Sequence, residues 1–160
     1  MRAGTIAITS LAFAVANMGA VHSRAETSVR ERFTVAPGQG RFPAAGVIRV
    51  DGVTYRLADL QAPAPGDRSR RSGRSYPVGF DAQQNWEAFA RSRTLVCDVL
   101  TRAGAPTVRC RAQASDGSRD AGEWLLSQGF AYAGVAAPPS YLAAEQDARS
   151  RRAGLHSVQP

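Results

Sequence analysis

The residues that could carry out chemistry in this chain are few and widely spaced. After residue 25 the only histidine is His156, so Ser-His-Asp or Cys-His chemistry would depend on that residue alone. The carboxylates Asp51, Asp59 and Asp67 occur at expected turns and strand ends, where a displaced metal site is conceivable but solvated carboxylates are more common. The chain contains no P-loop, no Gly-rich dinucleotide motif and no Cys/His spacing of a zinc site.

The basic residues point to a partner rather than to a reaction. All 20 are arginine, and the formal net charge is +7. A basic surface attracts polyanions such as nucleic acid or anionic lipid headgroups. Four of these residues fall in one short segment and are the candidate polyanion-binding residues: Arg68, Arg70, Arg71 and Arg74. The alternative is a solvated loop without a ligand. Aromatic side chains that could stack on bases are scarce, chiefly Tyr55, Tyr76 and Phe80.

The N-terminus has the pattern of a secretory signal peptide. Arg2 is followed by an apolar stretch from residue 6 to 21 and by Ser23-Arg24-Ala25, a small-x-small site. Cleavage after Ala25 would leave residues 26–160, with 18 basic and 13 acidic residues and a formal charge of 18 − 13 = +5. We expect a secreted or periplasmic protein with one small domain and no transmembrane segment after cleavage; an uncleaved anchor is the alternative.

The chain has two cysteines, Cys97 and Cys110, which are the remaining residues with reactive side chains. Cys97 and Cys110 lie on either side of a turn-like segment, residues 101–106, between two runs that are typical of strands. In an exported protein, this arrangement predicts a disulfide across a hairpin. A metal site would need further ligands, and no histidine is close in the sequence.

The elements that must position these residues follow from periodicity and turn signals. Alternating runs over 47–50 and 53–57 flank Asp51-Gly52, a strong signal for a β-hairpin. The segment 64–79, rich in Pro, Gly, Ser and Arg, predicts a flexible loop. Further strands are predicted over 32–35, 94–100 and 107–114, a short extended segment over 130–134, and helices over 81–91, with Asp81 as the cap, 120–128 and 140–152. Periodicity alone supports an α+β domain.

Several motifs together resemble the staphylococcal nuclease-like (thermonuclease) family. The segment VIRVDGVTYRLADLQAP, residues 47–63, is similar to the family's D-G-D-T-I-x-V-x-G-x-x-x-R-L-x-G-I-D-A-P-E. The segment 97–111 is similar to C-x-x-x-D-R-Y-G-R-x-x-A-x-C, 124–131 to W-L-V-x-x-G-x-A, and 141–155 to Y-x-x-x-E-x-x-A-R-x-x-x-x-G-L-W. The resemblance covers about residues 33–155. It implies a β-rich α+β fold, namely a five-stranded OB-fold-type barrel with about three helices.

The resemblance also implies an active site that this chain largely lacks. The two calcium-binding carboxylates of the family fall on Gly46 and Gln61, and the glutamate that activates water falls on Ala64. Of the two arginines that neutralise the phosphate, Arg56 is retained and the other falls on Ala105. Losing one positioned base or donor typically reduces the rate about 10²- to 10⁴-fold, and several are lost together here.

We therefore expect a non-catalytic binding module with a degenerate active site and possible affinity for nucleic acid or another polyanion. Arg56 could still grip a phosphate, or could hold the loop by bonding carbonyls or Asp59. The alternative is an active phosphodiesterase with a rearranged divalent-metal site, in which Arg102 or Arg109 replaces the missing arginine. Ca²⁺ is expected only under that alternative, and a purely protein-binding role is a third possibility.

Overall fold

The computed structural model describes residues 31–101, 104–115 and 117–157. The predicted signal peptide, residues 1–25, lies outside this part of the chain, and so do Arg102 and Asp116. None of the helices in the described part is long and apolar enough to cross a membrane.

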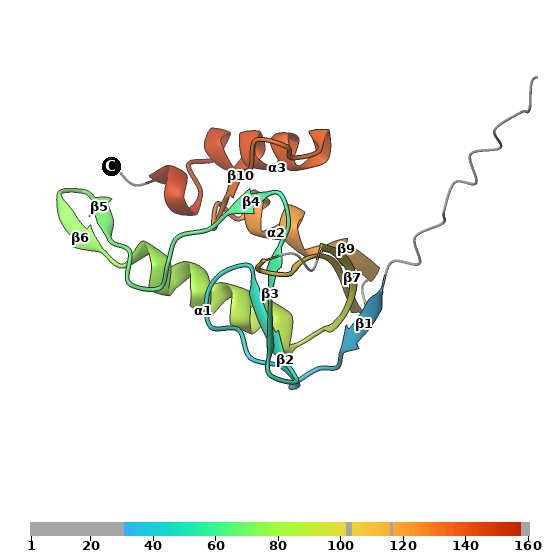
Figure 1. The fold of residues 1–160 in the computed structure, drawn as a ribbon. Coiled ribbons are helices and arrows are strands. Elements are labelled where there is room, and N and C mark those ends of the chain that lie inside the picture. Colours follow the sequence, from blue (N-terminus) through green and yellow to red (C-terminus); the bar gives the residue numbers. More distant parts are fainter. Residues whose placement is uncertain (1–30, 102–103, 116, 158–160) are drawn as a thin grey trace, which may run out of the picture.

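A curled, half-barrel sheet forms the centre of the molecule (Figure 1). Its strands lie in the order β1 (Arg32–Val35), β7 (Thr94–Thr101), β8 (Thr107–Ala114), β3 (Val53–Leu57) and β2 (Val47–Val50), and β9 (Gly117–Asp120) also pairs with β8. Every pairing is antiparallel except that of β3 with β8. The predicted β2–β3 hairpin and the first strand are confirmed with their bounds.

Three α-helices accompany the sheet, so the predicted strand-rich α+β class is confirmed. They are α1 (Val78–Arg91), α2 (Ala121–Ser127) and α3 (Pro139–Ser150), followed by the 3₁₀-helix η1 (Gly154–Ser157). Two small two-stranded sheets pair β4 (Leu60–Gln61) with β10 (Tyr132–Ala133) and β5 (Ser69–Arg71) with β6 (Arg74–Tyr76).

The core lies between the sheet and the helices. Trp86 of α1 is fully buried, and its indole Nε1 donates a hydrogen bond of 3.0 Å to the carbonyl of Val47. This bond satisfies the one polar atom that the ring takes out of water. The rings of Phe89 and Trp124 stack with centroids 3.9 Å apart, which joins α1 to α2. Apolar contact between helices and sheet therefore fixes the position of β2.

The predicted disulfide is present. Cys97 and Cys110 are directly opposite each other on β7 and β8, and both are fully buried. The bond joins the two longest strands of the sheet inside the core.

Three local predictions were wrong. Helix α1 begins at Val78 rather than at Asp81, and its N-cap is Pro77, which offers no side-chain cap; Asp81 instead lies in the first turn. The segment 64–79 is not simply a loop, because β5 and β6 form a hairpin within it. Tyr55, considered for base stacking, is buried and packs against Phe33.

Candidate functional site

A cavity beside β3 collects most of the positions that the resemblance singles out. It has a volume of about 520 Å³, and Gly46, Arg56 and Ala64 all line it, together with Asp59 and Thr107. Four of these residues lie between positions 46 and 64 and Thr107 comes from β8, and backbone hydrogen bonds bring them together. The amide of Leu57 donates to the carbonyl of Gly46 at 2.8 Å. We call this hollow the β3 cavity.

Two further positions lie near the β3 cavity but do not line it. Gln61 is exposed on β4, opposite Tyr132 of β10, and lines a neighbouring hollow. Ala105 is exposed in the turn before β8, next to Pro106, whose carbonyl accepts a hydrogen bond of 2.9 Å from the amide of Arg56. An arginine at position 105 would therefore start close to the backbone of Arg56, but the alanine has no charge to contribute.

The backbone conformation and the surroundings of Gly46 are unfavourable for an acidic side chain. Its φ of +68° lies in the left-handed region. A Cβ there would be 3.1 Å from Cδ1 of Leu60 and 3.6 Å from Cδ1 of Leu125, and the residue is buried. Any acidic side chain at this position would be strained and would enter an apolar environment, where an ionised carboxylate is costly.

Among the described residues that line the β3 cavity, Asp59 is the one acidic residue, and it is already paired. Its carboxylate accepts from Arg109 at 2.5 Å, and the Asp59 side chain is only 24 % exposed. The structure therefore assigns to Arg109 the contact that the sequence had suggested for Arg56. Asp59 also has a positive φ of 61°, and its carbonyl accepts from Gly134.

The other two candidate carboxylates do not join Asp59. Asp67 accepts a hydrogen bond of 2.8 Å from the amide of Ala64 and lines the neighbouring hollow with Gln61. Asp51 lies at the tip of the β2–β3 hairpin and lines a different cleft. Within residues 31–101, 104–115 and 117–157, no group of three His, Cys, Asp or Glu side chains could hold a metal ion. The donor set does not fit the Ca²⁺ that the resemblance implies.

Arg56 is left with an exposed side chain in the β3 cavity. In the described part of the chain, its guanidinium makes no hydrogen bond or ion pair. An arginine that presents its donors to solvent can contact a phosphate, but it supplies neither a base nor a metal ligand.

The predicted polyanion-binding residues lie together on the β5–β6 hairpin. We call residues 68–76 the arginine hairpin; it projects from the molecule on the side away from β1 and β9 (Figure 1). Arg68 donates to Ser75 at 2.8 Å, and Arg71 lies 3.8 Å above the ring of Tyr76 and donates to Ser157. These contacts order the hairpin.

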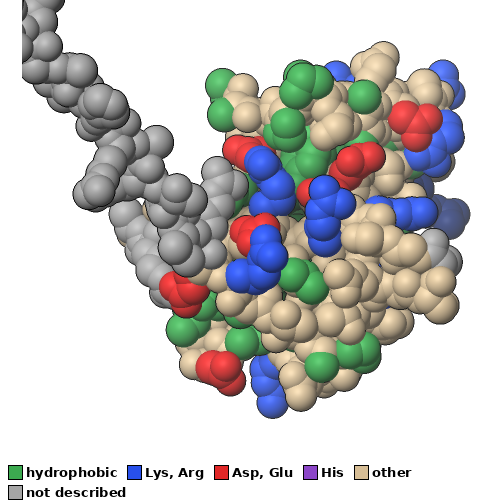
Figure 2. Space-filling view, turned by 90° about the vertical axis from the view of Figure 1, so that its right-hand side faces the viewer, with side chains coloured by type: hydrophobic (Ala, Val, Ile, Leu, Met, Phe, Trp, Pro, Cys, Tyr) green, Lys and Arg blue, Asp and Glu red, His purple; other side chains and the backbone are tan. Residues whose placement is uncertain are grey.

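Arg70 and Arg74, by contrast, are exposed. Among the residues that the structure describes, neither guanidinium has a side-chain partner. Figure 2 shows a different face of the molecule, where basic and acidic side chains lie side by side and their charges offset each other. The arginine hairpin contains no acidic residue between positions 68 and 76, so positive charges outnumber negative ones within it.

An aromatic surface adjoins the arginine hairpin. Tyr76 of β6 and Phe80 of α1 line one shallow hollow of about 350 Å³, and Phe80 is 52 % exposed. Burial, followed by the neighbouring Asp81, raises the pKa of the Tyr76 hydroxyl, so this residue stays neutral at physiological pH. Neutral rings beside unpaired guanidinium groups are typical of surfaces that hold single-stranded nucleic acid.

His156 has no catalytic neighbours in the described structure. Its ring meets that of Tyr132 edge-on, and its Nε2 is buried without a hydrogen-bond partner. Burial lowers its pKa first, and the nearby Arg149 lowers it further. Both cysteines are in the disulfide, so no thiol is available to pair with this histidine.

The sequence missed one polar cluster. The Tyr141 hydroxyl donates to Asp120 at 2.7 Å, and Asp120 also accepts from the first amides of α2. Burial raises the pKa of Tyr141 strongly, and the Asp120 carboxylate adds to the effect. The match of Tyr141 to the family pattern was a signal that it had a role, but the role is to hold α3 against α2.

The comparisons with known proteins do not add a family. No family model matches the chain, and no curated protein matches it in sequence.

Proposed function

We propose that this protein is an exported, non-catalytic module that binds single-stranded nucleic acid, built on a thermonuclease-like OB-fold barrel whose hydrolytic centre is degenerate. The arginine hairpin supplies the contacts to phosphates, and the surface of Tyr76 and Phe80 supplies the contacts to bases. The buried disulfide is compatible with export, as the signal-peptide pattern predicts.

The observation that carries the proposal is the juxtaposition of unpaired cations and an exposed ring. Arg70 and Arg74 project from a hairpin whose strand β6 ends at Tyr76, and Tyr76 shares a hollow with Phe80. Successive bases of a single strand can stack on such rings while the backbone follows the positive charge. A double helix presents its phosphates but not its base faces, so a single strand fits this surface better.

The β3 cavity supports binding but not hydrolysis by the family mechanism. Of the family's catalytic positions, only Arg56 keeps its chemistry, and Ala64 cannot activate water. Gly46 has no room for a strain-free carboxylate, and Asp59 is engaged by Arg109. Arg56 can extend the phosphate path of a bound strand, but it cannot replace a base and two metal ligands.

The test is binding of fluorescent single-stranded DNA and RNA of about 15 nucleotides at a series of salt concentrations. We expect affinity to fall with salt, with a slope of about −0.7 for each phosphate contact. Arg70→Gln/Arg74→Gln should reduce the magnitude of this slope by about 1.4. The matched control is Arg111→Gln/Arg119→Gln, which removes the same charge from exposed positions on β8 and β9.

A second variant separates stacking from charge. Phe80→Ala should weaken binding about 5- to 150-fold, from about 1–3 kcal/mol per stacked base, without changing the salt slope. Equal effects of the hairpin variant and its control would contradict the proposal, as would failure to bind either strand at about 50 mM salt.

The competing function is an active phosphodiesterase, and the observation that favours it is the unpaired Arg56 in the β3 cavity. Incubation of the same DNA and RNA with Ca²⁺, or with a chelator, tests it directly. Divalent-dependent cleavage that Arg56→Ala abolishes would replace the binding proposal with the catalytic one.

A further inference from the structure

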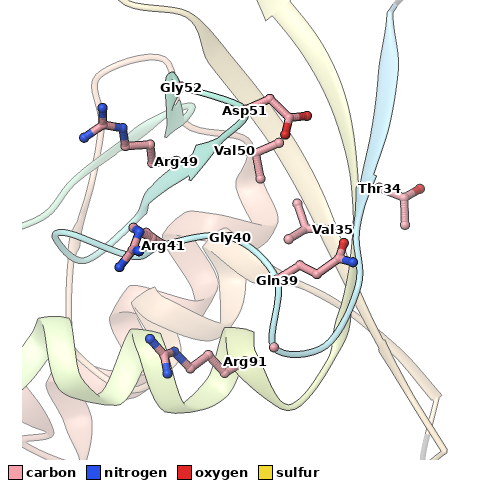
Figure 3. A pocket seen from close by; sticks show the side chains of 11 residues that line it. Thr34, Val35, Gln39, Gly40, Arg41, Arg49, Val50, Asp51, Gly52 and Arg91 are labelled. Atoms are coloured by element: carbon pink, nitrogen blue, oxygen red, sulfur yellow. The ribbon is translucent and has the colours of Figure 1, made fainter.

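A second charged hollow lies apart from the β3 cavity and from the arginine hairpin, and shares no lining residue with either. Its volume is about 900 Å³. Its walls are β1, the loop that follows β1, the tip of the β2–β3 hairpin and the last residue of α1 (Figure 3). We call it the arginine cleft, because Arg41, Arg49 and Arg91 line it.

Two of these arginines are held directly opposite each other. Arg41 and Arg49 form an isolated antiparallel bridge, in which the amide of each donates to the carbonyl of the other at 2.9 and 2.8 Å. Residues paired in this way are about 5.5 Å apart at Cα, and their side chains leave the same face. Like charges directly opposite each other are destabilising.

Among the described residues, no carboxylate forms an ion pair with either arginine. In the described ranges of the chain, neither Arg41 nor Arg49 has an acidic group within 4.0 Å, and both side chains are exposed. Figure 3 shows their guanidinium groups on the same side of the cleft. The fold therefore keeps two unneutralised cations together at a cost to stability, which is the arrangement expected of a binding site for an anion.

Arg91 adds a third cation on the same side. Its carbonyl accepts from the amide of Gly38 at 3.1 Å, which ties the loop after β1 to the end of α1. Its side chain is paired with Glu87 at 2.7 Å but remains 55 % exposed, so its free donors still face solvent. In Figure 3 the three guanidinium groups of Arg49, Arg41 and Arg91 form a column.

The other side of the arginine cleft has a different chemistry. There the carboxylate of Asp51 and the amide of Gln39 lie on the side opposite the arginines (Figure 3). These groups accept hydrogen bonds from hydroxyl or amino groups. A ligand that spans the cleft would therefore carry its negative charge at one end and hydrogen-bond donors at the other.

We infer that the arginine cleft binds a compact polyphosphate, and that it favours one joined to a group with hydroxyl or amino donors, as in a nucleoside triphosphate. The linked phosphates lie along the column of arginines, where guanidinium groups bond phosphate oxygens in pairs. The donor-bearing end lies against Asp51 and Gln39. A hollow of about 900 Å³ is large enough for a nucleotide and far larger than a single phosphate needs.

The experiment measures the melting temperature and the dissociation constant of the protein with inorganic triphosphate and with ATP. A ligand that binds only the folded state raises the melting temperature. We expect both ligands to raise it in the wild type and in the control Arg111→Gln/Arg119→Gln, but not in Arg41→Gln/Arg49→Gln. The dissociation constant of the cleft variant should rise at least about tenfold, because two charge-assisted contacts are lost.

The melting temperature of Arg41→Gln/Arg49→Gln without ligand shows whether this cleft variant is folded. Since it removes a like-charge pair, its melting temperature without ligand should be equal to or above that of the wild type. Backbone amide shifts on addition of triphosphate should centre on residues 38–41 and 49–52. Shifts centred on the arginine hairpin, or equal stabilisation of the cleft variant by triphosphate, would overturn the assignment, as would no stabilisation of the wild type.

ATP separates the two sides of the cleft. It should bind more tightly than inorganic triphosphate, and Asp51→Asn should weaken ATP binding while leaving or improving triphosphate binding. Asparagine tolerates the positive φ of 48° at this position, so the variant should fold. Equal affinity for the two ligands would overturn the role assigned to Asp51. Displacement of triphosphate by a single-stranded oligonucleotide, lost in Arg41→Gln/Arg49→Gln, would show a macromolecular ligand instead.

Discussion

Introducing a carboxylate at position 46, where the resemblance places the first calcium ligand, should destabilise the fold rather than produce hydrolysis. The change is Gly46→Asp, and three effects add. A residue with a side chain at a φ of +68° costs about 1 kcal/mol. The new Cβ, 3.1 Å from Cδ1 of Leu60, forces that side chain to move, at about 1 kcal/mol. Placing a carboxylate among apolar side chains costs about 2 kcal/mol more.

The expected loss is therefore about 4 kcal/mol, which lowers the melting temperature of a domain of this size by roughly 15 °C. Urea denaturation followed by tryptophan fluorescence measures it, since Trp86 is buried in the core. Gly46→Ala isolates the backbone and contact effects, at about 2 kcal/mol. Gly38→Ala isolates the backbone effect alone, because Gly38 has a φ of +76° and open space around its Cβ position.

A different ranking would refute this reasoning. If Gly46→Asp is as stable as the wild type, the pocket can accept a carboxylate and the argument from Leu60 fails. If Gly46→Asp is also stabilised by Ca²⁺ and cleaves DNA, the carboxylate at position 46 is the only metal ligand that the β3 cavity lacks. Equal losses for Gly46→Ala and Gly38→Ala would show that the contact with Leu60 contributes nothing.

Three further predictions concern stability. Replacing Cys97 and Cys110 by alanine should cost about 3 kcal/mol in urea denaturation, because the bond closes a loop with a sequence separation of 13; a loss below about 1 kcal/mol would contradict this. Asp120→Ala should reduce the free energy of unfolding by about 2–3 kcal/mol, because it removes the cap of α2 and leaves the Tyr141 hydroxyl without an acceptor. Adding Tyr141→Phe to this variant should cost little more. Additive losses would show that the two residues are not coupled. The pKa of His156 in the folded protein lies below its ordinary value of 6.5, so the unfolded chain binds the proton first and the free energy of unfolding should decrease as the pH falls below about 6.5. His156→Gln should flatten this part of the stability profile. An unchanged profile would show that other groups cause the pH dependence.

Local signals in the sequence predicted much of the sheet. Asp51-Gly52 joins the two alternating runs of the β2–β3 hairpin, and both of its turn residues have the positive φ that such turns require. The two cysteines were predictable because the runs that contain them are joined by one short turn, which brings them opposite each other. These elements depend on residues near in sequence, and so pattern and turn chemistry suffice.

Other elements left no such signal. Strands β5 and β6 have three residues each and no apolar alternation, so the arginine hairpin had the composition of a loop. The start of α1 at Val78 was missed because no side chain caps it. Tyr55 was considered as an exposed aromatic, but β3 turns alternate residues inward and places it in the core.

The sequence by itself determined which chemical groups the site can have: Arg56 is present, and Gly46 and Ala64 carry no acid. It also determined the excess of arginine, from which we expect a polyanionic partner. Only the tertiary structure decided the partners, because pairing across strands depends on register between segments far apart in the chain. That register pairs Asp59 with Arg109, leaves the Arg56 guanidinium without a partner among the described residues, and sets Arg41 opposite Arg49.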